Sequence, residues 1–245
     1  MPIKSTKLSI IIPVYNESDN LPFLFKNLVK FKYKNFFSAV EIILINDGST
    51  DDSLEQLLNF KNEYDNNVIK ILTYSKNFGL SYALKIGIQN ASFQNVLYFD
   101  SDLEIPLDEI EKFIPFINKD YDLLSGVREN RKDCFIKKIS SSIANRIRLK
   151  ILNDNCTDTG CPFKFFKKDF ALKLPLDYRG FHRFIPFFAR LKNVKTKYIP
   201  VKHRKRQFGK SKFNLSNRLF CTFIDLFGMK WLLNRQVIGD NIKEL

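Results

Sequence analysis

Short apolar runs alternate with segments of helical periodicity along the first hundred residues, and this alternation limits the fold more than any other feature. The runs are "SIIIPV" (9–14), "EIILIN" (41–46), "VIKILT" (68–73) and "NVLYF" (95–99), and polar turn residues follow each of them. Runs of this length and composition are typical of buried strands. Buried strands that alternate with helices predict a parallel sheet covered on both faces. We therefore expect an α/β fold with a mostly parallel central sheet.

The sequence places polar residues directly after three of these predicted strands. They are Asn16 and Glu17, Asp47 and Gly48, and Asp100 and Asp102. In open parallel sheets, ligands bind beyond the carboxyl ends of the strands, which meet at one edge. We therefore expect the three pairs to converge on one crevice.

The stretch "FDSDLE" carries three carboxylates within five residues, which repel one another unless a positive partner lies between them. Residues i and i+2 of an extended segment point to the same side, so Asp100 and Asp102 can converge on one cation. Oxygen ligands suit Mg²⁺ or Mn²⁺, and two carboxylates leave coordination positions for substrate phosphates. A lone D-x-D triplet is common in loops, but its place at the end of a buried strand favours a metal site.

Charge is divided unevenly between the two halves of the chain. Residues 1–120 hold 12 Lys and no Arg against 16 acids, whereas residues 121–245 hold 28 Lys and Arg against 10 acids, a balance of +18. Such a basic half indicates contact with phosphates of nucleic acid, nucleotides or lipid headgroups, and a solvated basic surface is the alternative. The candidates for binding phosphate are Arg128, Arg131 and the basic loop 203–212.

The second half predicts two helices of unusual composition. Residues 135–152 have Ile at helical spacing and basic residues elsewhere, which makes an amphipathic basic helix. Residues 215–234 form a predicted helix that is apolar around most of its girth and contains Phe220, Phe223, Phe227 and Trp231. Further strands are predicted within 121–130 and 195–206.

The length of 245 residues is enough for one large α/β domain. No repeat or Gly/Ser linker divides the chain, so we expect one domain over 1–235 and a tail over 236–245. No apolar run reaches the roughly 18 residues of a membrane span, and the N-terminus lacks the pattern of a signal peptide. The four cysteines form no C-x-x-C pair, which favours reduced thiols in a cytosolic protein.

Five stretches, taken in order, resemble the family 2 glycosyltransferases of GT-A fold. They are "SIIIPVYNE", "ILINDGSTDDS", "NFGLSYALKIGI", "LYFDSDLE" and "HRKRQFGKSKFNL". More closely, they are similar to the sugar transferases that act on polyprenyl phosphates such as dolichyl phosphate. The resemblance runs from about Leu8 to Arg235. It implies a single GT-A catalytic domain, in which residues 1–120 bind a nucleotide sugar and the basic residues 121–235 face the acceptor and the membrane.

The matching positions imply roles for individual residues. Those implied to contact the nucleotide sugar are Pro13, Tyr15, Glu17, Asp47 and Asp100. Those implied to hold Mg²⁺ or Mn²⁺ are Asp100 and Asp102, with Glu104 at a third position where the family often has Gln. Those implied to bind the acceptor phosphate are Arg128, Arg131, Lys137, Ser141, Ser211 and Lys212. The catalytic set implied by the resemblance is Asp102, Arg128, Arg206 and Asp158.

The implied reaction moves a sugar from a UDP- or GDP-sugar to undecaprenyl or dolichyl phosphate, with inversion at the anomeric carbon. A lipid phosphate is already anionic near neutral pH, so this reaction requires no general base. Transfer to a saccharide hydroxyl in surface polysaccharide synthesis is the alternative, and it would need a base such as Asp158. A nucleic-acid-binding α/β protein is a remote third reading, since the acidic half would repel a polyanion.

A polyprenyl phosphate resides in a bilayer, and many members of the resembled family carry C-terminal transmembrane helices. Here the basic helix 135–152 and the apolar helix 215–234 suit an interfacial position. We therefore expect peripheral contact with the cytoplasmic face of a membrane. The alternative is that these apolar faces complete the core or a dimer contact. An integral membrane partner and a homo-oligomer both stay open, and no nucleic-acid partner is expected.

Overall fold

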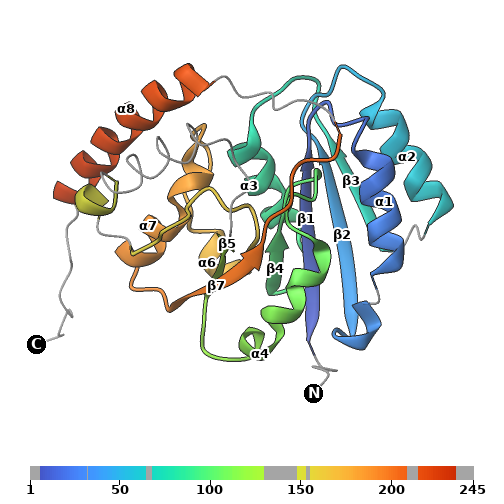
Figure 1. Cartoon of the computed structure of the whole chain (residues 1–245), viewed down its shortest axis with the longest axis horizontal. Coiled ribbons are helices and arrows are strands. Elements are labelled where there is room, and N and C mark those ends of the chain that lie inside the picture. The colour runs from blue at the N-terminus through green and yellow to red at the C-terminus, as the bar shows by residue number, and fades with distance from the viewer. Residues whose placement is uncertain are drawn as a thin grey trace, which may run out of the picture.

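A single seven-stranded sheet forms the centre of the computed structural model (Figure 1). The structure describes residues 6–31, 33–64, 68–129, 148–152, 155–208 and 215–235, with the side chains of Lys34 and 215–223 left out. The strands are β1 (Lys7–Val14), β2 (Ala39–Asn46), β3 (Ile69–Thr73), β4 (Asn95–Tyr98), β5 (Leu123–Glu129), β6 (Lys164–Lys167) and β7 (Thr196–Lys202). Their order across the sheet is β3-β2-β1-β4-β6-β5-β7, so strands from both halves of the chain share one sheet.

The sheet is mostly parallel, as the sequence predicts. Parallel pairs join β1 to β2 and β4, β2 to β3, and β5 to β7. The exception is β6, which runs antiparallel to both β4 and β5. The strand β6 is not predicted from the sequence, because its four residues, "KFFK", are too few to show a strand pattern within an aromatic and basic stretch.

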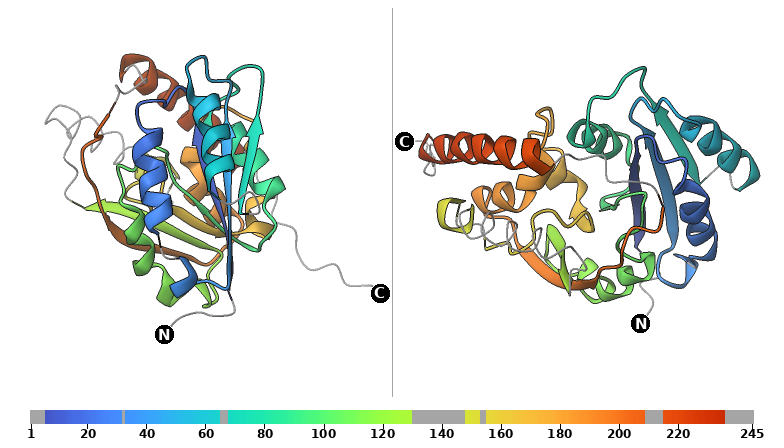
Figure 2. Two further views of the ribbon diagram at one scale, coloured as in Figure 1. Left: turned by 90° about the vertical axis from the view of Figure 1, so that its right-hand side faces the viewer. Right: turned by 45° about the horizontal axis from the view of Figure 1, so that its top comes forward.

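Helices cover both faces of the sheet (Figure 2). On one face lie α1 (Leu21–Lys30), η1 (Tyr33–Asn35), α2 (Ser53–Glu63), η2 (Leu107–Lys112) and α4 (Ile114–Ile117). On the other lie α3 (Leu80–Asn90), α6 (Lys168–Ala171), η3 (Phe181–Phe184), α7 (Ile185–Leu191) and α8 (Leu215–Asn234). Each face of the sheet has its own hydrophobic core, and strand β1 contributes to both. Ile10 and Ile12 pack into the core on the first face, and Ile11 packs into the core on the second. Two-sided burial explains why the strands are continuous apolar runs.

The described side chains of helix α8, residues 224–234, attach it to the body along one side. Its Leu226 and Met229 are buried in the second core, and Asp225 accepts a 2.8 Å bond from Arg183. Phe227 and Trp231, by contrast, are 70% and 58% exposed. Within the described residues, no helix combines the length and apolar character needed to cross a bilayer. Of the predicted basic helix 135–152, only residues 148–152 are described, and they are helical.

Candidate active site

The loops that follow β1 and β2 meet at the carboxyl edge of the sheet, and hydrogen bonds join them. The backbone N–H of Asn16 donates to Ser49 Oγ at 2.9 Å, and that of Glu17 donates to Ser53 Oγ at 2.9 Å. Asn16 Oδ1 accepts a 2.7 Å bond from the N–H of Thr50. The residues after β1 are therefore tied to the loop between β2 and α2, close to the predicted residue Asp47.

Asp47 is buried at the end of β2 and organises the segment that leads into α3. Its Oδ1 accepts the N–H of Phe78 at 2.8 Å, and its Oδ2 accepts Asn77 Nδ2 and the N–H of Gly79, both at 2.9 Å. Burial raises the pKa of the Asp47 carboxyl in spite of these donors. The neighbouring Gly48 has φ +67, and a Cβ there would lie 2.3 Å from the backbone of Lys76. This close approach requires glycine. Sequence reasoning did not find the contacts with residues 77–79.

Asp100 and Asp102 lie in a turn beyond β4, so the expectation of an extended segment is wrong. Strand β4 ends at Tyr98, and Leu103 has φ +50. The turn rather than the strand pleat positions the two carboxylates. Asp100 Oδ1 accepts the hydroxyl of Tyr98 at 2.7 Å, and Asp102 Oδ1 accepts the N–H of Glu104 at 3.1 Å.

The two carboxylates are crowded and shielded from water. Burial raises the pKa of Asp100, and burial together with the nearby charges of Asp100 and Glu104 raises the pKa of Asp102 to about 7. A bound divalent cation would favour the charged forms. Among the described residues, no three His, Cys, Asp or Glu side chains are grouped to hold a metal by themselves. Two carboxylates that leave positions for phosphate oxygens fit Mg²⁺ or Mn²⁺ in this setting.

Glu104, the predicted third ligand, faces a different partner. Its Oε2 lies 3.3 Å from Nε2 of His203, whose side chain is almost fully buried. The hydrogen bond from His203 lowers the pKa of Glu104 despite the opposing effect of burial. A metal-binding role for Glu104 stays a prediction.

The segment 203–208, here called the strap, leaves β7 and runs along the site edge of the sheet; it is the orange segment that rises past β4 and β1 in Figure 1. Arg204 fastens it, since its N–H donates to Glu104 O at 2.8 Å and its Nε donates to Leu103 O at 2.6 Å. The guanidinium also lies 4.9 Å from the centre of the Phe23 ring. Sequence reasoning treated Arg204 only as part of a basic loop, and no local pattern marks these contacts.

Arg206 extends from the strap between two predicted site residues. Its Nη2 forms an ion pair with Glu17, and its Nη1 lies 3.4 Å from Asp102 Oδ2. Its Nε donates to Phe208 O at 2.8 Å, which orients the guanidinium. The strap thus joins the residues after β1 to those after β4.

Arg128, on β5, forms a bidentate ion pair with Asp158. Arg128 Nε and Nη2 donate to the two Asp158 oxygens at 2.7 Å each, and the Arg128 N–H donates to Oδ2 at 3.1 Å. Burial opposes the charge of Arg128, but the bonds to Asp158 prevail and raise its pKa. Both oxygens of Asp158 are therefore engaged by one cation.

A buried lysine beneath the carboxylates was missed by sequence reasoning. Lys164 on β6 stands opposite Tyr98 in the antiparallel pair and is 2% exposed. Its Nζ donates to Thr159 O at 3.2 Å and to Cys161 O, and its charge favours ionised Asp100. It therefore fixes the loop that presents Asp158. The sequence signal is a single Lys within the apolar stretch "PFKFF".

Two of the remaining predicted residues lie in β1 or just beyond it, and the others lie outside the described residues. Pro13 lies within β1 beside Ile45, and Tyr15 is 37% exposed just beyond the strand. The predicted phosphate-binding residues Arg131, Lys137, Ser141, Ser211 and Lys212 lie outside the described residues.

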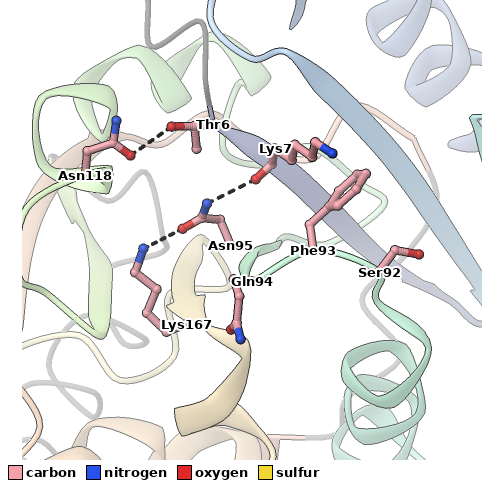
Figure 3. Close-up of a pocket in the computed structure, with 8 residues that line it drawn as sticks. All are labelled: Thr6, Lys7, Ser92, Phe93, Gln94, Asn95, Asn118 and Lys167. Carbon is pink, nitrogen blue, oxygen red and sulfur yellow. Dashed lines mark hydrogen bonds between the residues drawn. The ribbon is translucent and has the colours of Figure 1, made fainter.

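A separate groove of about 540 Å³ lies at the other end of the sheet, where β1 and β4 begin (Figure 3). Its polar groups bond to one another: Thr6 Oγ1 donates to Asn118 Oδ1 at 2.8 Å, and Lys167 Nζ donates to Asn95 Oδ1 at 2.6 Å. No predicted site residue lines it. The groove is therefore separate from the candidate active site.

The model of the family "Glycosyl transferase family 2" matches residues 9–174. Two similar relatives are named undecaprenyl-phosphate 4-deoxy-4-formamido-L-arabinose transferase. The one from Yersinia pestis is 34% identical over 92% of this chain and 67% of its own length. The one from Sodalis glossinidius is 32% identical over 87% of this chain and 65% of its own length. The chain thus spans about two thirds of the length of these relatives.

Solved structures share the fold at low sequence identity. Glucosyl-3-phosphoglycerate synthase from Mycobacterium tuberculosis, in complex with Mn²⁺, UDP and glucosyl-3-phosphoglycerate, matches with a TM-score of 0.68 and 15% identity over 96% of this chain and 81% of that chain. A mannosyltransferase from Pyrobaculum calidifontis, in complex with GDP-Man and Mn²⁺, matches with a TM-score of 0.66 and 12% identity over 98% and 68%. The fold is therefore the GT-A fold.

Proposed function

The chain belongs to glycosyl transferase family 2 and is a glycosyltransferase, and we propose that it transfers a sugar from a nucleoside diphosphate to a polyprenyl phosphate, with inversion. The observation that carries this acceptor is the Arg128–Asp158 pair. A general base takes up the proton it removes, and a protonated Asp158 would lose the bidentate ion pair that both of its oxygens form with Arg128. A phosphate nucleophile needs no base. The names of the similar relatives, which specify undecaprenyl phosphate, support the same acceptor.

Asp100 and Asp102 are the residues that would hold Mg²⁺ or Mn²⁺ in this proposal. The bound ion would neutralise charge on the departing diphosphate. Arg206 lies beside Asp102 and would add a guanidinium to the same phosphates, which it can bind through two parallel hydrogen bonds. The bound Mn²⁺ in two structural neighbours supports a divalent ion here.

The hydrogen bonds of Asp47 favour uridine over guanosine as the nucleoside. Among the described residues, two donors meet Asp47 Oδ2 and one meets Oδ1. Each carboxylate oxygen accepts about two hydrogen bonds, so the remaining capacity lies on Oδ1 alone. The uracil edge offers one N–H, whereas guanine offers an N–H and an adjacent amino group that require both oxygens. We therefore propose a UDP-sugar as donor.

The outer face of α8 is the proposed membrane contact. Ile224, Phe227, Trp231 and Leu232 are all at least 39% exposed and recur at helical spacing. Lys230 and Arg235 lie among them, and apolar anchors with basic charge suit an anionic lipid surface. Peripheral contact of this kind, on the cytoplasmic face as the family resemblance implies, would give the site access to a lipid-borne phosphate. Burial of this face against a second copy is the competing explanation.

One assay tests the proposed reaction. The purified chain is given Mn²⁺ or Mg²⁺, a panel of UDP- and GDP-sugars, and a short-chain polyprenyl phosphate. We expect a sugar-lipid product with UDP-sugars that is abolished by EDTA and by Asp102→Asn. The matched control, Asp120→Asn, alters an exposed carboxylate away from the candidate site and should leave the product unchanged. Transfer to saccharide hydroxyls alone would contradict the proposal.

A further inference from the structure

Arg206 contacts Asp102, one of the two carboxylates that would hold a metal ion. Asp102 Oδ1 already accepts the N–H of Glu104, so Oδ2 is the oxygen with more capacity for a cation, and Arg206 Nη1 lies 3.4 Å from it. The three side chains that meet here are largely buried, at 13% exposure for Glu17, 15% for Asp102 and 17% for Arg206. Buried carboxylates without a partner are costly, so the guanidinium stabilises Glu17 and Asp102.

A divalent cation and the guanidinium would compete for the same carboxylate. Both are positive, and repulsion between them is strong where water is largely excluded. A metal ion held by Asp102 would therefore favour the departure of Arg206 from it. The strap permits this, because it is fastened separately through Arg204 to Leu103 and Glu104.

A nucleoside diphosphate supplies the alternative partner for Arg206. Its phosphates match the planar fork of a guanidinium and also provide oxygens to a metal ion. We propose that Arg206 is a coupling residue: it holds Asp102 before the donor binds and releases it when the diphosphate arrives, so that metal and donor bind cooperatively. This inference rests on the proposed metal-dependent function and adds cooperative binding of the metal and the donor. Free metal alone binds weakly, and donor and metal enter together.

Binding of Mn²⁺ without turnover is the direct test. Free Mn²⁺ is measured by electron paramagnetic resonance during titration of the whole chain, with and without saturating UDP. Arg206→Gln should bind Mn²⁺ alone about fivefold or more tightly than the wild type, since the competitor is gone. The same variant should show a smaller increase in Mn²⁺ affinity on adding UDP. Arg206→Lys, whose compact ammonium cannot bridge two carboxylates, should lie between the two.

Lys205→Gln is the matched control, because it removes one positive charge from the exposed neighbouring position of the strap. It should change the affinity for Mn²⁺ alone less than twofold. If Arg206→Gln binds Mn²⁺ no more tightly than Lys205→Gln does, the proposal is overturned while the metal site stands. If the wild type binds no Mn²⁺ even with UDP, the proposed metal-dependent function fails, and this proposal fails with it. Circular dichroism of each variant confirms that it is folded.

Discussion

Two arginines meet carboxylates at this site in opposite ways. Arg128 binds both oxygens of Asp158 at 2.7 Å, and the two side chains are 11% and 7% exposed. Arg206 is shared between Glu17 and Asp102, and its distance to Asp102 is 3.4 Å. A bidentate, buried pair is a fixed part of the framework, whereas a guanidinium divided between two loops can exchange partners. The contrast separates residues that shape the site from residues that respond to ligands.

Loss of the Arg128–Asp158 ion pair should have the largest effect on stability. Arg128→Met leaves the buried Asp158 carboxylate without its main partner and should lower the free energy of unfolding by about 3–5 kcal/mol. The double variant Arg128→Met/Asp158→Leu should recover most of this loss, measured by urea denaturation. Equal instability of the single and double variants would show that the pair is not the cause.

Loss of Arg206, which is shared between Glu17 and Asp102, should affect activity more than stability. Arg206→Met removes a cation from the proposed diphosphate site and should lower kcat by about 10²–10³-fold. Its unfolding free energy should fall less than that of Arg128→Met, because Glu17 and Asp102 are more exposed than Asp158. Steady-state kinetics and urea denaturation on the same preparation check both values. A loss of stability as large as that of Arg128→Met would remove the distinction between the two arginines.

The smallest predicted effect is a pH dependence of stabilisation by metal. The pKa of Asp102 is raised to about 7 in the folded, metal-free chain, so the folded state binds more protons than the unfolded state between about pH 4 and pH 7. The stability contributed by this protonated carboxyl is present below about pH 4 and is lost as the pH rises through 7. Because metal binds the ionised form, Mn²⁺ should raise Tm by a few degrees more at pH 8 than at pH 5.5. An equal shift at both values would exclude Asp102 as a ligand.

The parts of this structure that depend on local patterns were predictable, and those that depend on the path of the chain were not. Apolar runs identify β1 to β4 and place Asp47 and Asp102 after them, because burial on both faces dictates the composition of such strands. The antiparallel β6 has no such pattern in its four residues. The Arg128–Asp158 pair joins residues 30 positions apart, and the Arg206–Asp102 contact joins residues 104 apart.

The same limit applies to chemical roles. The sequence left open whether Asp158 acts as a base, because a carboxylate alone does not reveal what engages it. Only the position of Arg128 argues against that role. The burial of Lys164 was not predicted for a related reason, since a lysine in an aromatic stretch is normally expected at the surface.

The acceptor proposed here is a lipid phosphate that reacts without a general base. A competition between a polyprenyl phosphate and the corresponding polyprenol, in one reaction with a UDP-sugar and Mn²⁺, separates the two possibilities, because the two acceptors differ only in the nucleophile. We expect a glycosylated product from the phosphate alone. A product from the free alcohol at a comparable rate would rule out this acceptor.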